Sequence, residues 1–337
     1  MKQYIDKLAN KQNLNRDEAA ELCRLMLATN TPSQVAELLT LLHVKGETSD
    51  EICGFVDVMQ QHMKKITHST PAIDIVGTGG DGANTVNIST AASIVTASCG
   101  ATVIKNGNRS SSSKCGSADY LERAGIALDA QPDQIARCIA QTQYGFCFAP
   151  TFHPAFAQFK ELRQQLKIRT IFNLIGPLLN PARVQRLVLG VYKPELLELY
   201  ANALSEQGIE RALVVHGSGL DELNCLGVNQ AIEVHNGQQT TMTIDPKQLG
   251  LAYCQLSDLQ GGDADKNVRI LNAVLSGEQM GAIADTVALN AGAALYVYGS
   301  VSSLKEGVEQ ALSCIQSGRP AAKLQEIATF FSEEAHA

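Results

Sequence analysis

The 337-residue sequence lacks any run of about 18 or more apolar residues, the length that a helix needs to cross a bilayer. The closest approach, residues 286–301, is interrupted by Asn290 and by glycine and serine residues. An uninterrupted apolar stretch of the signal-peptide type is also missing, because Lys2, Asp6 and Lys7 are spread through the first residues. We therefore expect no membrane span and, by default, a cytoplasmic protein.

Closely spaced cysteine pairs, low-complexity tracts and internal repeats are likewise missing. The nine cysteines are odd in number and scattered, so they do not form the short spacings that zinc sites and dithiol motifs use. Positive charge is in deficit: 27 Lys and Arg residues face 34 Asp and Glu residues, which gives a net charge of −7. These features predict reduced core thiols and exclude a general nucleic-acid binder, although a local basic patch could still bind a small anion.

The composition that remains is that of a globular protein, with 45% hydrophobic and 18% charged residues. A chain of this length usually forms two domains, or one large α/β domain with an appended lobe. Residues 1–68 have apolar residues at helical spacing and helix-start signals at Asn15, Thr31 and Thr48, so they predict an all-helical lobe.

Residues 69–337 have a different texture, in which short β-branched runs alternate with helical stretches. This alternation predicts an α/β domain with a largely parallel central sheet flanked by helices. Residues 231–234 and 240–244, separated by Asn236-Gly237, predict an antiparallel pair around a turn. The strands expected earlier in the domain cover residues 73–76, 102–104, 187–191 and 213–215.

A glycine-rich loop follows the first of these strands. Residues 77–82 read Gly-Thr-Gly-Gly-Asp-Gly, and a helix rich in Ala and Val opens at Asn87. Glycines let backbone amides approach an anion, and the helix start adds a favourable dipole, so the loop predicts a phosphate site. The loop also fits the Gly-x-Gly-x-x-Gly pattern of dinucleotide folds, but the helix starts late, Asp81 would face a pyrophosphate, and Lys105 stands where an acid is expected. A tight strand-to-helix turn is the remaining alternative.

A second polar loop follows the next strand. Residues 105–119 bring Lys105, Asn108 and Arg109 together with a cluster of serines, and this set suits phosphate oxygens as well as a solvated surface loop. Together, Gly77 to Thr90 and Lys105 to Asp119 resemble the two signature loops of the anthranilate phosphoribosyltransferase family. The resemblance continues through residues 148–155, Arg163 and residues 169–182, and then through residues 219–223 and 261–267, so it covers nearly the whole chain.

The resemblance implies a fold, a reaction and an assembly. It implies transfer of the phosphoribosyl group of phosphoribosyl pyrophosphate to anthranilate in tryptophan biosynthesis. It also implies a homodimer formed through the helical lobe, with catalysis in the cleft between that lobe and the α/β domain of nucleoside phosphorylase type. The expected division is a lobe of residues 1–68 and a catalytic domain of residues 69–337, with some residues near 190 joining the lobe.

Site residues are carried over position by position. For phosphoribosyl pyrophosphate the resemblance implies Gly77, Gly79, Gly80, Asp81, Thr85, Asn87, Ser89, Thr90, Lys105 and Ser117. For anthranilate it implies Gly77, Asn108 and Arg163, and for Mg²⁺ it implies Ser89, Asp221 and Glu222. Lys105 and Arg163 are the best candidates for catalytic residues, since a neutral aniline nitrogen does not require a strong base.

Three alternatives to these assignments stay open from the residues themselves. Asp221 and Glu222 could be an acidic pair at a helix amino terminus, and Arg163 could be a solvated helix residue. His153 could act as a base or line the acceptor channel.

The chain also departs from the family pattern. Asn106 replaces the usual histidine beside the acceptor, Cys115 replaces a common serine, and Asn224 and Asn229 stand where Ser and Thr are typical. Because Asn106 loses the ring and its protonation near neutral pH, a paralogous enzyme that uses another aromatic amine is the nearest rival. A pyrimidine-nucleoside-phosphorylase-like enzyme is the second rival, and a nicotinamide-dependent oxidoreductase the third.

Overall fold

The computed structural model describes residues 1–110 and 114–334, and its first part is a layer of four helices. Capping boxes at Asn15 and Thr48 start two of them, where each side chain accepts from a backbone N–H and a glutamate returns the bond. Apolar residues such as Leu22 and Phe55 are fully buried between the helices. The four helices are α1 (Lys2–Ala9), α2 (Arg16–Ala28), α3 (Pro32–Lys45) and α4 (Ser49–Met59).

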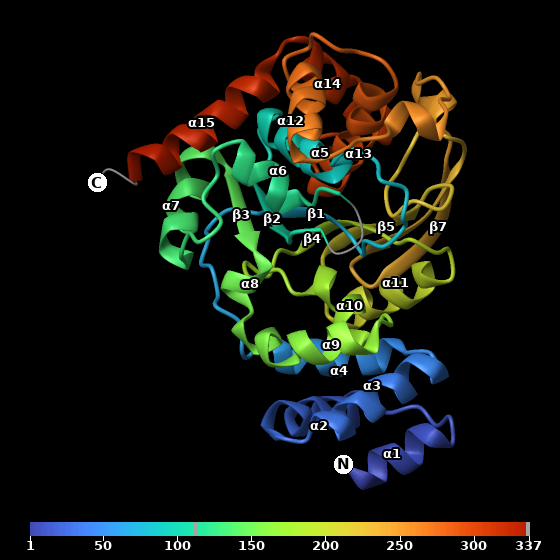
Figure 1. Ribbon diagram of the computed structural model, residues 1–337. Helices are drawn as coiled ribbons and strands as arrows, with labels where there is room; N and C mark the ends of the chain where they lie inside the picture. Colours follow the sequence, from blue (N-terminus) through green and yellow to red (C-terminus); the bar gives the residue numbers. More distant parts are fainter. Residues whose placement is uncertain (111–113, 335–337) are drawn as a thin grey trace.

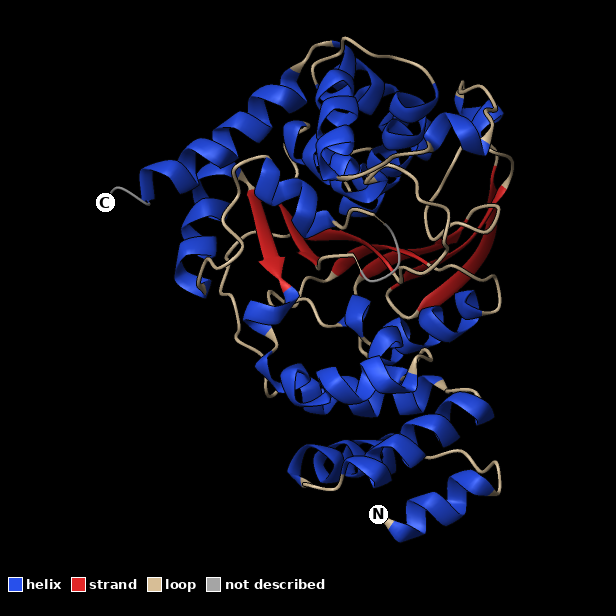
Figure 2. Cartoon of the chain, viewed as in Figure 1, coloured by secondary structure: helices blue, strands red, loops and turns tan. Residues whose placement is uncertain are grey.

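A seven-stranded sheet in the order β3-β2-β1-β4-β5-β6-β7 forms the centre of the second part (Figure 2). The first five strands are parallel, and β6 and β7 form the antiparallel hairpin expected around Asn236-Gly237. The strands are β1 (Ile73–Gly77), β2 (Val103–Gly107), β3 (Tyr144–Phe148), β4 (Arg186–Gly190), β5 (Arg211–His216), β6 (Asn229–His235) and β7 (Gln238–Ile244). The expected fold class is therefore confirmed.

Helices cover both faces of the sheet (Figure 1). On one face lie α5, α12, α13, α14 and α15, and on the other α8 to α11 separate the sheet from α1–α4. Their bounds are α5 (Ile88–Ser98), α6 (Ser117–Arg123), α7 (Pro132–Thr142), α8 (Ala149–Phe152), α9 (Lys160–Leu166), α10 (Ile171–Leu174), α11 (Leu196–Glu206), α12 (Ala264–Leu275), α13 (Ala282–Tyr298), α14 (Leu304–Gln316) and α15 (Arg319–Glu334). Throughout the described ranges, no helix is both long and apolar enough to cross a membrane.

The strand order reverses at β1, which has β2 on one side and β4 on the other. Open α/β sheets bind ligands at such a switch point, outside the carboxyl ends of the strands, because the loops leave in opposite directions there. The loops after β1, β2 and β5 all start at this edge. The fold therefore brings the two sequence-predicted loops and the Asp221-Glu222 segment to one region.

Candidate active site

The glycine loop after β1 presents backbone amides that no protein acceptor uses. Gly79, Gly80 and Gly82 have φ values of 66°, 84° and 72°, a left-handed conformation that side chains disfavour. Within the described chain, the N–H groups of Gly80, Asp81 and Gly82 donate to no protein atom. Helix α5 begins only at Ile88, which agrees with the argument against a dinucleotide fold. Free amides in a left-handed turn form a concave anion site.

The acidic pair lies directly against this loop. The N–H of Gly79 donates to Asp221 Oδ2 at 2.6 Å, and the N–H of Ser89 donates to Glu222 Oε1 at 3.3 Å. Segment 217–228, which is fully described, contains no helix, so the alternative of an acidic pair at a helix amino terminus is wrong. Instead Glu222 meets the amino terminus of α5, whose dipole stabilises its negative charge.

Two glycines leave room for Asp221. Gly77 of β1 and Gly190 of β4 face each other in register, and a Cβ on either would overlap Asp221. A side chain at either position would therefore push the acidic segment out of the site.

The site fits a cation. Burial and the nearby Asp81 raise the pKa of Asp221 to about 7, and burial with Asp221 raises the pKa of Glu222. Glu222 Oε2 is buried with no protein partner. In the described residues, no group of three or more His, Cys, Asp or Glu side chains forms a metal cage. Mg²⁺ does not need one, since it binds through one or two carboxylates together with substrate phosphates.

Buried asparagines brace the acidic segment. Asn224 Nδ2 donates to the Gly217 carbonyl at 2.6 Å, and the Asn224 N–H donates to Asn229 Oδ1 at 2.9 Å. Asn229 Nδ2 returns a bond to the Asn224 carbonyl at 3.0 Å. Asn290 of α13 accepts from the Leu223 N–H and donates to its carbonyl. Asn224 and Asn229, two of the departures from the family pattern, thus hydrogen-bond to each other beside Asp221 and Glu222.

The start of α5 gathers further predicted residues. Ser89 Oγ accepts from the buried Lys105 Nζ at 3.4 Å, and Lys105 also donates to the Ile75 carbonyl at 2.5 Å. Thr85 forms a bridge with Gln260 beside the loop. Thr90 is only 1% exposed, and its Oγ1 is buried without a described hydrogen-bond partner.

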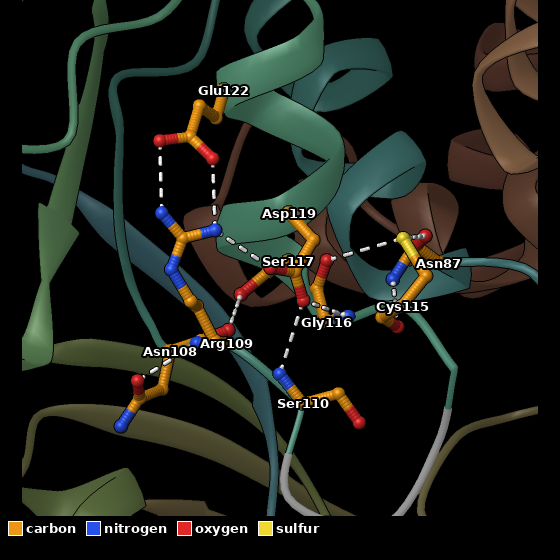
Figure 3. Close-up of polar contacts among 9 residues, drawn as sticks. All are labelled: Asn87, Asn108, Arg109, Ser110, Cys115, Gly116, Ser117, Asp119 and Glu122. Atoms are coloured by element: carbon orange, nitrogen blue, oxygen red, sulfur yellow. Dashed lines mark hydrogen bonds and ion pairs between the residues drawn. The ribbon is translucent and has the colours of Figure 1, made fainter. Parts of the chain in front are cut away.

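The second loop is drawn together by Asp119 (Figure 3). Asp119 accepts from the N–H groups of Ser110 and Gly116 and from Arg109, whose fork also pairs with Glu122. Ser117 Oγ donates to the Asn108 carbonyl at 3.2 Å. Residues 111–113 of the serine cluster lie outside the described residues.

Asn87 joins the two loops. Its Nδ2 donates to the Cys115 carbonyl at 3.0 Å (Figure 3). Its Oδ1 accepts from Asn267 Nδ2 at 3.0 Å. Cys115 Sγ also approaches Asn87 Oδ1 at 3.4 Å. The substitution at Cys115 therefore lies in a loop-to-loop contact.

Sequence reasoning did not single out Asp74 or Asn180. Strands β1 and β2 pair in register only at Ile73 and Val103. Beyond that pair the fully buried Asp74 carboxylate accepts from the Asn106 N–H at 3.2 Å and from Asn180 Nδ2 at 2.8 Å. A lone acid in an apolar strand was the available signal. Asp74 fills the gap between the two strands that carry the loops.

Asn106 is 6% exposed and lies on the side of β2 opposite Lys105. Its Nδ2 donates to the Gly176 carbonyl at 3.2 Å, and its Oδ1 is buried without a partner. The substitution of the family histidine thus leaves one amide oxygen available for a donor.

Arg163 lies on α9 and makes no described hydrogen bond or ion pair with the two loops. Burial lowers the pKa of Arg163, and within the described chain its guanidinium has no hydrogen-bond or ion-pair partner. This arrangement contradicts a fully solvated helix residue and leaves an arginine fork free for a carboxylate. The same region holds an aromatic cluster in which Phe159 stacks on Phe172 and Phe156 meets His153 edge-on.

His153 predicts a specific acid sensitivity. Burial lowers its pKa to about 4, below the ordinary 6.5, and neither ring nitrogen has a well-formed hydrogen bond. The unfolded chain therefore binds this proton first, so the stabilising contribution is present above about pH 6.5 and is lost as the pH falls towards 4. Between about pH 7.5 and about pH 5, we expect His153→Phe to lose about 2 kcal/mol less free energy of unfolding than the wild type in urea titrations.

The exposed His62 supplies the control for this prediction. His62→Asn should lose as much stability on acidification as the wild type. Equal losses of unfolding free energy in the wild type and His153→Phe would show that folded His153 takes up its proton as readily as the unfolded chain does, and would contradict the prediction.

Comparisons with known proteins agree with this fold and this site. A sequence profile described as "Glycosyl transferase family, helical bundle domain" matches residues 2–63, and one described as "Glycosyl transferase family, a/b domain" matches residues 69–321. The chain is thus a glycosyl transferase of the class that joins a helical bundle to an α/β domain. Anthranilate phosphoribosyltransferases of Rhodopseudomonas palustris and Chlamydia felis are 45% and 41% identical to it over 97% of this chain and 97% and 95% of their own lengths. The chain belongs to the anthranilate phosphoribosyltransferase family.

Solved structures show the same likeness. The Thermus thermophilus anthranilate phosphoribosyltransferase superposes with a TM-score of 0.92 at 40% identity and covers 98% of this chain and 99% of its own. The Saccharomyces cerevisiae enzyme in complex with PRPP and Mg superposes with a TM-score of 0.89 at 28% identity and covers 98% and 97%. The family and the fold that the loops indicated are confirmed.

Proposed function

We propose that this chain transfers the 5-phosphoribosyl group of phosphoribosyl pyrophosphate to the amine of anthranilate, giving N-(5-phosphoribosyl)anthranilate and pyrophosphate in tryptophan biosynthesis. The observation that carries the proposal is the meeting of Asp221 and Glu222 with the glycine loop and the start of α5. That arrangement puts free amides and a cation site side by side, which is what a pyrophosphate leaving group requires.

The reaction exchanges one bond at C1 of the ribose for another. The C1–N bond to the amine forms as the C1–O bond to pyrophosphate breaks, the bonding pair leaves with pyrophosphate, and the amine gives up one proton. Because the aniline nitrogen is neutral near pH 7, the protein's task is to position the substrates and to stabilise the leaving group. We assign no general base.

In this proposal the phosphoribosyl pyrophosphate site is formed by the loops. The free amides of Gly80, Asp81 and Gly82 bind pyrophosphate oxygens, and the hydroxyl of Ser89 and the ammonium of Lys105 lie next to them. The buried Thr90 and the loop-bridging Asn87 shape the site from behind. The remaining members are Gly77, Gly79, Thr85 and Ser117.

Mg²⁺ is the proposed metal, held by Asp221 and Glu222 with the Ser89 hydroxyl. Bound there, it would neutralise charge that develops on the departing pyrophosphate. The unpartnered Glu222 Oε2 and the like-charged Asp81 support a cation at this point.

Anthranilate is the proposed acceptor, with its carboxylate on the unpartnered guanidinium of Arg163. Asn108 and Gly77 are the other residues that we propose for the anthranilate site. We further propose a homodimer formed through the helical lobe, where Val44 of α3 is 68% exposed. A cytoplasmic location is proposed on the cysteines, because no disulfide joins any of the nine within the described residues.

The test of this function is pyrophosphate release from phosphoribosyl pyrophosphate and Mg²⁺, first with anthranilate and then with a panel of other aromatic amines. Fast release with anthranilate, and with none of the other amines, supports the proposal. Release only with another amine would contradict anthranilate as the acceptor and would still support phosphoribosyl pyrophosphate as the donor. Release of ribose 1-phosphate from a nucleoside and phosphate would favour a phosphorylase.

Asn106→His tests the acceptor side directly. Because Asn106 and Lys105 lie on opposite sides of β2, we expect the KM for phosphoribosyl pyrophosphate to stay within about twofold. The imidazole must fit a buried position where an amide bonds Gly176, so the KM for anthranilate should rise by up to about tenfold, the worth of one hydrogen bond. Turnover of anthranilate that appears only in Asn106→His would contradict anthranilate as the acceptor.

A further inference from the structure

Arg169, between α9 and α10, reaches across to the glycine loop. Its Nη1 donates to the Gly79 carbonyl at 3.0 Å, and its Nη2 donates to the Thr78 carbonyl at 3.0 Å. We propose that Arg169 is a positioning residue that orients the glycine-loop amides towards the pyrophosphate of the donor substrate. This inference rests on the proposed function, since it names the residue that sets the geometry of the same site.

The geometry of the peptide unit carries the argument. A peptide is planar and trans, so its C=O and N–H point in opposite directions. The Thr78 carbonyl shares a peptide with the Gly79 N–H, and the Gly79 carbonyl shares one with the Gly80 N–H. By holding both carbonyls, the guanidinium turns both N–H groups away from itself. The Gly79 N–H meets Asp221, and the Gly80 N–H is left without a described protein acceptor.

The arginine is itself fixed from the other side. The Tyr192 ring lies 4.1 Å from the guanidinium carbon, at stacking distance. The Tyr192 N–H donates to Thr78 Oγ1 at 3.3 Å, and the Thr78 N–H donates to the Gly190 carbonyl at 2.9 Å. Thr78 is therefore tied to the segment after β4 as well as to Arg169.

Close approach explains why the loop has glycine at this point. A Cβ on Gly80 would overlap Arg169 Nη1, and the φ of 84° at Gly80 disfavours any side chain. Arg169 Nε is buried without a hydrogen-bond partner, and the described partners of Nη1 and Nη2 are the two loop carbonyls and no carboxylate. The carbonyls of Thr78 and Gly79 are thus the described acceptors of the Arg169 guanidinium.

Substitutions separate positioning from a direct charge effect. Lysine keeps the charge but cannot donate two parallel bonds to adjacent carbonyls or stack as a plane. We expect Arg169→Lys and Arg169→Met each to raise the KM for phosphoribosyl pyrophosphate by roughly tenfold or more, with kcat changed less, because charged hydrogen bonds are lost in both. A graded result, in which Arg169→Lys stays near wild type and only Arg169→Met is impaired, would show a direct charge contact and overturn the proposal.

Tyr192 tests the same clamp without touching the arginine. Tyr192→Leu removes the ring and should raise the KM for phosphoribosyl pyrophosphate by about threefold or more. Tyr192→Phe keeps the stacked ring, so its KM should stay close to that of the wild type. Lys193→Met is the matched control, since Lys193 also lies over the Tyr192 ring, at 5.5 Å, and makes no described bond to the loop. Tyr192→Leu with an unchanged KM would count against the clamp.

Amide hydrogen exchange in the substrate-free protein keeps this inference separate from the proposed function. In Arg169→Lys, exchange at the hydrogen-bonded amides of Thr78 and Gly79 should accelerate by about tenfold or more, whereas other amides of the sheet edge stay unchanged. Unchanged exchange there would overturn the clamp. If the wild type released no pyrophosphate from the donor, the proposed function would fail while the exchange result would still decide the role of Arg169.

Discussion

Replacing Asp221 with asparagine should lower kcat/KM for phosphoribosyl pyrophosphate by about a thousandfold, or about 4 kcal/mol of transition-state stabilisation. The amide fits the space left by Gly77 and Gly190 but supplies no charge for a cation. Glu222→Gln should act in the same way, because Glu222 Oε2 is the buried oxygen without a partner. Steady-state pyrophosphate release at saturating Mg²⁺ measures both effects.

The pH dependence of the metal requirement adds an independent readout. With the pKa of Asp221 raised to about 7, a cation must displace a proton below that pH. The Mg²⁺ concentration that gives half-maximal rate should therefore rise as the pH falls through 7. In Asp221→Asn this dependence should flatten.

Glu233→Gln is the matched control for the acidic pair. Glu233 is a mostly buried carboxylate of β6 that pairs with Arg211, at the start of β5 and away from the loops. Its variant should keep the wild-type requirement for Mg²⁺. If Asp221→Asn kept more than about a tenth of the wild-type rate, the assignment of the metal to Asp221 would be wrong.

Asp74→Ala should have the largest effect on stability, a loss of about 3 to 5 kcal/mol in the free energy of unfolding. The alanine leaves the Asn106 N–H without an acceptor and removes one of the two acceptors of Asn180 Nδ2, whose bond to the Ile104 carbonyl remains. It also removes the opposite charge that acts most strongly on the buried Lys105. All of these groups are out of contact with water, so the lost bonds are not replaced. Urea unfolding followed by circular dichroism measures the difference.

Asp265→Ala is the comparison for Asp74. Asp265 also forms an ion pair, with Arg123, but both side chains are more than half exposed. Solvent screens that pair, so its loss should cost less than about 1 kcal/mol. Equal effects of the two substitutions would show that water reaches Asp74 in the folded protein.

Local patterns predicted most of the fold. The β-branched runs gave four of the parallel strands, and Asn15 and Thr48 marked helix starts that the capping boxes confirm. Strand β3 was not predicted, because Tyr144–Phe148 contains a glycine and a cysteine and no β-branched residue. Its strand conformation comes from pairing with β2 along five register positions, which a local pattern does not contain.

The sequence predicted the loops and acids of the candidate site but not the residues that hold them in place. Glycines, acids and cations are recognisable locally because their chemistry is specific to anions and metals. The residues that hold them, such as Asn290 and Asn180, act across 67 and 106 positions of sequence. A lone polar residue in an apolar element, like Asp74 or Asn290, was the only local trace of those contacts.

Lys105 and Asn106 are consecutive, yet the alternation of a β-strand sends them to opposite sides of the sheet. Lys105 contacts the start of α5, and Asn106 contacts the segment after α10. A change at position 106 therefore alters the contact with the segment after α10 and leaves the contact of Lys105 with α5 in place. In evolutionary terms, the contacts on the two sides of β2 can change separately, because a substitution at one of the two positions leaves the neighbours of the other in place.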